Sequence, residues 1–110
     1  MAKSSRALLK IEFPQGVRLG PGKVRLLECV AQTGSISGAA RLMQMSYRRA
    51  WLLIDECNSI FGQPVVETVA GGTGGGGAKI TDFGRRVVKV FRGMETEVDV
   101  LVKSRMAQLK

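Results

Sequence analysis

Two adjacent arginines, Arg48 and Arg49, are the residues whose type and position best suit recognition chemistry. They follow Ser46-Tyr47 at the start of a helix-forming run. A cation at a helix N-terminus opposes the helix dipole, so it gains nothing from this position locally. Arginine can bind guanine through two hydrogen bonds or attract a phosphate. The pair therefore indicates contact with nucleic acid, and a solvated surface pair is the alternative.

The residues around the two arginines have the spacing of a helix-turn-helix. Ser35 or Ser37 is suited to cap a first helix, and Ser46 to cap a second, because serine accepts a hydrogen bond from a first-turn amide. The apolar residues of the second helix recur at helical spacing: Ala50, Leu53, Ile54, Cys57 and Phe61. The leading residues of such a helix reach the DNA major groove. We expect this motif at about 35–61.

The candidate DNA contacts lie on these two helices and on a later hairpin. Tyr47 either donates its hydroxyl to a phosphate or packs against the preceding helix. Trp51 is expected to pack in the core or between helices, and Arg41 to face outward toward the DNA backbone or toward solvent. The candidate set is Arg41, Ser46, Tyr47, Arg48, Arg49, Gly74, Gly75, Gly76 and Lys79.

A glycine-rich run over 71–77 separates two β-forming segments, at 65–69 and 78–80. It contains a G-x-G-x-x-G pattern, but a dinucleotide-binding turn also needs a helix that starts at the glycines. A P-loop needs Lys-Ser/Thr after the last glycine, whereas Ala78 follows here. Bare backbone can approach a phosphate closely. We expect a wing at about 65–80, and a hairpin tip without a ligand is the alternative.

Helices and a strand are also predicted on either side of these motifs. Residues 8–13 alternate like a strand, and 21–33 have helical periodicity after Pro21-Gly22. Thr81-Asp82 caps a last helix at about 81–108, which carries an apolar stripe: Phe91, Met94, Val98, Leu101 and Leu109. We expect this stripe to pair with a second copy of the chain, and folding back onto its own domain is the alternative.

Composition restricts the possible functions. Of 110 residues, 17 are Lys or Arg and nine are Asp or Glu, which gives a net charge of +8 and favours a nucleic acid, or else an acidic membrane surface. The alternative is a basic protein without such a partner. There is no histidine, the commonest general base and metal ligand. No signal peptide or membrane span is evident, so a cytoplasmic location is expected. Cys29 and Cys57 are expected to be buried free thiols rather than a disulfide.

The combination of motifs resembles one regulator family. Its elements are Gly34-Ser35-Ile36, Ala39-Ala40, Ser46-Tyr47, Ala50-Trp51, the glycine run ending in Ala78, and Thr81-x-x-Gly84. Together they resemble the N-terminal winged-helix domain of ModE-type molybdate-responsive regulators, with a LysR-like helix-turn-helix. The resemblance implies targets in molybdenum homeostasis. Family members often carry molybdate-binding domains after this one, and this sequence stops at Lys110. We therefore expect molybdate to bind this chain weakly or not at all.

These observations predict a mainly α fold with a small β-hairpin, over a single domain at 1–110. The fold is a winged helix-turn-helix with a long C-terminal dimerisation helix. The predicted function is sequence-specific binding of a palindromic DNA operator by a homodimeric transcriptional regulator of molybdenum uptake or metabolism, without a cofactor, a metal or enzymatic activity. A nucleotide-binding protein or enzyme using the glycine loop is one alternative, and a protein-interaction adapter is another.

Overall fold

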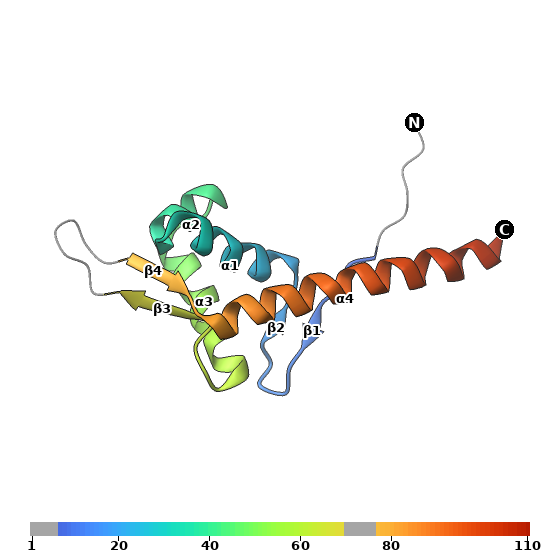
Figure 1. Cartoon of the computed structure of the whole chain (residues 1–110), viewed down its shortest axis with the longest axis horizontal. Coiled ribbons are helices and arrows are strands. Elements are labelled where there is room, and N and C mark those ends of the chain that lie inside the picture. Colours follow the sequence, from blue (N-terminus) through green and yellow to red (C-terminus); the bar gives the residue numbers. More distant parts are fainter. Residues whose placement is uncertain (1–6, 70–76) are drawn as a thin grey trace.

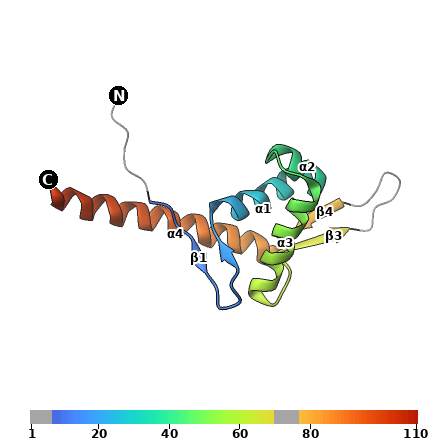
Figure 2. The same cartoon turned by 180° about the vertical axis from the view of Figure 1, so that it is seen from behind.

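The computed structural model describes residues 7–69 and 77–110, which form a mainly helical fold with two small hairpins (Figure 1). Helices α1–α3 pack together, the β3–β4 hairpin projects from one side, and α4 extends away on the other (Figures 1 and 2). In chain order the elements are β1 (Ile11–Glu12), β2 (Arg18–Leu19), α1 (Pro21–Thr33), α2 (Ile36–Leu42), α3 (Tyr47–Phe61), β3 (Val66–Val69), β4 (Gly77–Ile80), α4 (Asp82–Met106) and a short 3-10 helix (Ala107–Leu109).

The helix boundaries follow from local capping. Ser35, rather than Ser37, caps α2 by accepting a hydrogen bond from the Gly38 amide at 2.9 Å. Gly34 ends α1 with φ +74°, a left-handed conformation that glycine adopts without a steric penalty. Thr81 caps α4 through the Gly84 amide at 2.9 Å. The predicted winged helix-turn-helix with a long last helix is confirmed.

The N-terminal hairpin differs from the sequence prediction. The strand predicted at 8–13 is only Ile11–Glu12, because its antiparallel partner Arg18–Leu19 offers just two residues to pair with. Sequence reasoning missed β2 altogether. The turn between the strands closes through Phe13, whose amide donates to the Val17 carbonyl at 2.9 Å. This hairpin covers one side of the core.

The core lies where α1, α3 and the start of α4 meet the base of the β3–β4 hairpin. Its largest fully buried side chains are Phe91, Leu26, Leu27, Val24, Val30, Val65, Cys29 and Cys57. Phe61 of α3 joins the β1–β2 hairpin and α4 to this core. Its ring packs edge-to-face on Phe13, between β1 and β2, and on Phe83 of α4, with centroids 5.7 Å and 5.3 Å apart. Such aromatic pairs add to the stabilisation from burial alone.

The two cysteines are buried free thiols, as predicted. Burial raises the pKa of the Cys57 thiol to about 11, because the low-polarity surroundings disfavour the thiolate. The thiolate is the reactive form, so this cysteine is protected both by its position and by its protonation state.

An ion-pair network fixes the middle of α4 against α1. Arg92 on α4 binds Glu28 on α1 at 2.8 Å and Glu95 one turn further along α4 at 2.7 Å. The hydrogen bond from Arg92 lowers the pKa of Glu28 below its ordinary value. Together with buried Phe91, this network sets the direction in which the rest of α4 leaves the body of the molecule (Figure 1).

Candidate nucleic-acid interface

The α2–turn–α3 segment has the geometry that a helix-turn-helix requires. Ala39 and Ala40 on α2 are buried, and their small side chains allow the helices to approach closely. The turn between the helices places Gln44 at φ +56°, and the Met45 amide donates to the Ala40 carbonyl at 3.0 Å. Ser46 then caps α3 by accepting from the Arg49 amide at 3.1 Å. The first residues of α3 are thereby presented at the surface.

The exposed face of α3 carries more than the predicted polar residues. Tyr47, Arg48 and Arg49 are exposed, and Arg41 is exposed at the end of α2. One turn further along α3, Trp51 and Leu52 are also exposed, at 44% and 46% of their surface. The expectation that Trp51 packs in the core or between helices is therefore wrong in part, since almost half of its surface faces solvent.

The two arginines have different surroundings. Arg48 lies on the outer face of α3, whereas Arg49 lines a hollow of about 330 Å³ between α3 and the start of α1. Three other cationic residues line the same hollow: Lys10, Arg18 and Lys23. Two of them are paired, Arg18 with Glu12 at 3.5 Å and Lys23 with Glu56 at 2.9 Å. The hollow nevertheless has an excess of positive charge beside Arg49, which suits a phosphate.

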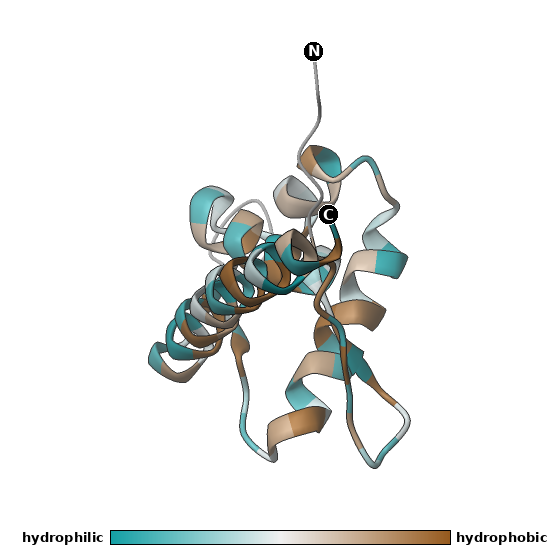
Figure 3. Cartoon of the chain, turned by 90° about the vertical axis from the view of Figure 1, so that its right-hand side faces the viewer, coloured by the Kyte–Doolittle hydropathy of each residue, from teal (hydrophilic) through white to brown (hydrophobic). Residues whose placement is uncertain are grey.

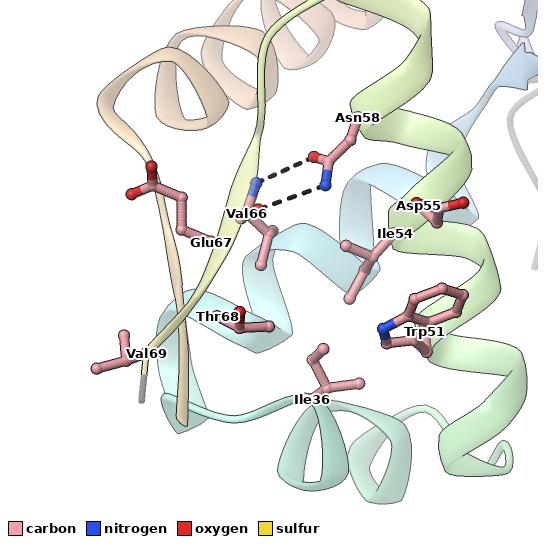
Figure 4. Close-up of a pocket in the computed structure, with 9 residues that line it drawn as sticks. All are labelled: Ile36, Trp51, Ile54, Asp55, Asn58, Val66, Glu67, Thr68 and Val69. Carbon is pink, nitrogen blue, oxygen red and sulfur yellow. Dashed lines mark hydrogen bonds between the residues drawn. The ribbon is translucent and has the colours of Figure 1, made fainter. Parts of the chain in front are cut away.

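A groove of about 770 Å³ separates α3 from β3 (Figure 4). Asn58 spans its inner end: its side-chain oxygen accepts from the Val65 and Val66 amides at 2.8 Å and 3.3 Å. Asp55 and Glu67 also line the groove. The hydrogen bonds to Asn58 fix the β3–β4 hairpin relative to α3. The carboxylates of Asp55 and Glu67 disfavour a phosphate inside the groove.

The β3–β4 hairpin is the predicted wing. Val66 pairs with Ile80 and Glu67 with Lys79 in antiparallel register, and the Ala78 amide donates to the Gly34 carbonyl at 3.0 Å. Lys79 is exposed. Gly74, Gly75 and Gly76 lie outside the described residues. A strand, β4, begins at Gly77, the last glycine of the run, whereas a dinucleotide site needs a helix that starts at the glycines.

Replacing Lys79 with alanine should weaken DNA binding without changing sequence preference. Loss of one phosphate contact reduces the slope of log K against log salt by about one unit. Fluorescence anisotropy titrations over a range of salt concentrations measure this slope. Lys89→Ala, which removes an exposed lysine from α4 instead, is the matched control. Equal slopes for wild type and Lys79→Ala would remove Lys79 from the DNA contacts.

Within residues 7–69 and 77–110, no group of three or more His, Cys, Asp or Glu side chains is placed to hold a metal ion. None of the helices described there is long and apolar enough to cross a membrane.

The sequence model of the bacterial regulatory helix-turn-helix proteins of the lysR family matches residues 22–85, which include α1–α3 and the wing. The chain belongs to this family. Two solved structures share the LysR-type fold. ArgP from Mycobacterium tuberculosis matches 80% of the chain and 30% of its own length, with a TM-score of 0.52 and 16% identity. VV2_1132, a LysR family transcriptional regulator, matches 79% of the chain and 28% of its own length, with a TM-score of 0.56 and 17% identity.

This LysR-type chain is also similar to molybdenum-related proteins, which confirms the resemblance to ModE. The molybdenum transport protein ModE of Azotobacter vinelandii is 41% identical over 83% of the chain and 34% of its own length. The molybdenum-pterin-binding protein MopA of Rhodobacter capsulatus is 38% identical over 81% of the chain and 34% of its own length. The DNA-binding transcriptional dual regulator ModE of Escherichia coli is 37% identical over 76% of the chain and 32% of its own length. The chain spans about a third of the length of these relatives.

Proposed function

We propose that this chain binds double-stranded DNA at specific sequences and regulates transcription of genes for molybdenum uptake or metabolism. The observation that carries the proposal is the exposed, cationic leading end of α3 in a LysR-type helix-turn-helix. A net charge of +8 supports a polyanionic partner. A bacterial regulator of this kind acts on the chromosome, so we propose a cytoplasmic location for the chain.

The molybdenum part of the proposal rests on the named relatives. The matched region of each includes the helix-turn-helix, and their names concern molybdenum transport, molybdenum-pterin binding or ModE-type regulation. We infer that the target genes are shared rather than only the fold, because identities of 37–41% to these proteins far exceed the 16–17% to the LysR-type structures.

Selection of binding sites from random double-stranded DNA tests the proposed function. The chain should enrich one sequence, and mapping of the tagged protein on its own chromosome should place that sequence upstream of molybdenum genes. Enriched sites that lie only elsewhere would contradict the molybdenum assignment. A failure to enrich any sequence would instead favour the adapter alternative. We propose no catalytic role for the chain.

We further propose that α4 pairs two copies of the chain. Its outer half projects from the body of the molecule, with Leu101 53% exposed and Leu109, on the 3-10 helix, 77% exposed. Figure 3 shows hydrophobic segments recurring along the helix. Phe91 has to be removed from the expected pairing stripe: it is only 1% exposed and belongs to the core of its own chain. Met94 also packs against that core in part. The first part of α4 thus packs on its own domain, which was the alternative to pairing along the whole stripe.

An apolar groove beside the first half of α4 supports this pairing. It has a volume of about 380 Å³ and lies between α4 and the β1–β2 hairpin, with Phe13, Phe83 and Val90 among its lining residues. Burying one large apolar side chain contributes about 1.5–3 kcal/mol, so a few such contacts offset the cost of association. A twofold dimer presents two α3 helices to half-sites spaced by multiples of about 34–36 Å, hence a palindromic operator.

Replacing Leu101 with glutamate should shift the chain toward monomer and weaken its binding to a two-half-site operator. A carboxylate placed in an apolar interface loses its hydration without gaining a partner. Thr96→Glu adds the same charge to an exposed position on the opposite side of α4 and is the control. Light scattering at tens of micromolar measures the mass. Leu101→Glu and wild type sharing one mass would contradict pairing through this part of α4.

A further inference from the structure

An apolar pair, Trp51 and Leu52, lies on the exposed face of the proposed DNA-reading helix. Exposed apolar residues scattered singly over a protein surface need no explanation. These two are adjacent in the sequence and follow the cationic start of α3 by one turn. Their side chains are 44% and 46% exposed. The helix therefore presents an apolar surface directly behind Tyr47 and Arg48.

The position of the pair along α3 matches the spacing of stacked base pairs. Trp51 follows Tyr47, and Leu52 follows Arg48, by four residues, so each stands one turn behind a leading residue on the same side of the helix. Four residues advance a helix by about 6 Å. Successive base pairs are about 3.4 Å apart. Trp51 and Leu52 are three and four residues past Arg48, so with α3 running along the stacked bases they reach a level about one to two base pairs from that of Arg48.

The electrostatic surroundings favour a base edge over a phosphate as the contact of Trp51. Its ring lies beside the α3–β3 groove, near Ile36 of α2 (Figure 4). The charged residues that line that groove are acidic, namely Asp55, one turn further along α3, and Glu67 on β3. A phosphate would be repelled there, whereas an uncharged, partly apolar base edge would not.

We propose that Trp51 and Leu52 recognise the 5-methyl group of thymine in the major groove. Thymine is the standard base that presents a methyl group there, and apolar side chains contact it. This inference rests on the proposed function, because it requires α3 to enter the major groove. It adds a sequence requirement: each half-site carries thymine about one to two base pairs from the position that Arg48 contacts.

Substitution of single thymines by deoxyuridine in the selected operator tests the proposal, because it removes the methyl group and keeps the base pairing. Wild type should lose affinity by roughly fourfold at one or two thymines in each half-site, the value of one buried methyl group. Trp51→Ala or Leu52→Ala should bind the thymine operator more weakly and should no longer respond to deoxyuridine at one of these positions. Trp51→Phe, which keeps an apolar ring, should retain part of the response.

Leu8→Ala serves as the control, since it removes an exposed leucine outside the helix-turn-helix. It should leave both the affinity and the response to deoxyuridine unchanged. Thermal unfolding of each variant shows whether the fold is retained, and Trp51→Phe serves as the test variant if Trp51→Ala unfolds. The inference is overturned if deoxyuridine is tolerated at every thymine, or if the variants keep the full wild-type response.

Tryptophan fluorescence gives a second readout, because Trp51 is the only tryptophan of the chain. Its emission should change when the thymine operator binds, and change less when deoxyuridine replaces the contacted thymine. Emission that is the same with and without bound operator would contradict the contact. A chain that selects no DNA sequence defeats the proposed function and this inference together. A chain that selects a sequence without any dependence on the methyl group defeats only the inference.

Discussion

Replacing Gly84 with alanine should lower the free energy of unfolding by about 1–3 kcal/mol, the usual cost of overpacking a core. A Cβ atom at this position would overlap the backbone oxygen of Val65 and lie 2.7 Å from Cγ1 of Ile80. Neither neighbour moves easily, because the Val65 carbonyl accepts from the Thr81 amide at 2.9 Å and Ile80 is buried. Chemical denaturation monitored by circular dichroism measures the change.

Gly93→Ala on the same helix is the matched control. A Cβ atom there meets nothing within 4 Å, so alanine gains helix propensity without a clash. This variant should be more stable than wild type by roughly 0.5–1 kcal/mol. The two glycine-to-alanine substitutions in α4 should thus change the free energy of unfolding in opposite directions. A Gly84→Ala protein as stable as wild type would show that α4 does not pack this closely on the base of the wing.

Replacing Arg48 with alanine should weaken operator binding and relax sequence preference, because Arg48 lies on the outer face of α3. A bidentate contact between arginine and guanine discriminates against other bases by about 1–3 kcal/mol. Competition between the operator and single-base variants, measured by fluorescence anisotropy at fixed salt, gives the preference at each position. Arg48→Ala should lose discrimination at one position in each half-site.

Arg49→Ala should weaken binding in a different way. Its side chain lines the basic hollow beside Lys10, so we expect it to contact a phosphate. Affinity should fall for all sequences alike, with a salt slope lower by about one unit. Arg85→Ala on α4 is the control, because that arginine is exposed and paired with Asp82 at 3.1 Å. Unchanged affinity in both Arg48→Ala and Arg49→Ala would contradict the interface.

Local signals predicted most of the fold. Ser35, Ser46 and Thr81 cap helices where the sequence indicated helix starts. Gly34 and Gly62 end helices with positive φ. These features depend on residues within a few positions of one another, so the sequence alone is sufficient to locate them.

The features that sequence reasoning missed depend on tertiary packing. Strand β2 has only two residues, Arg18 and Leu19, which is too short to show a strand periodicity, whereas the alternation at 8–13 did indicate β1. Trp51 lies next to buried Ala50 at the edge of the apolar face of α3, so only the packing of neighbouring elements determines how much of it remains exposed. The periodicity of α4 continues from Phe91 to Leu101 without a break, although the body of the molecule ends between them. The different surroundings of Arg48 and Arg49 also depend on tertiary packing, because α1 and the β1–β2 hairpin form the hollow that Arg49, but not Arg48, lines.

The ratio of affinities for operator and unrelated DNA, measured for the wild-type chain at physiological salt, tests the central claim most directly. Sequence-specific regulators bind their sites roughly 10³–10⁷ times more tightly than other DNA. We expect a ratio of at least about 10³ for the wild-type chain, reduced several-fold in Arg48→Ala and unchanged in Arg85→Ala. A ratio near one for the wild-type chain, with binding that depends only on salt, would contradict the central claim.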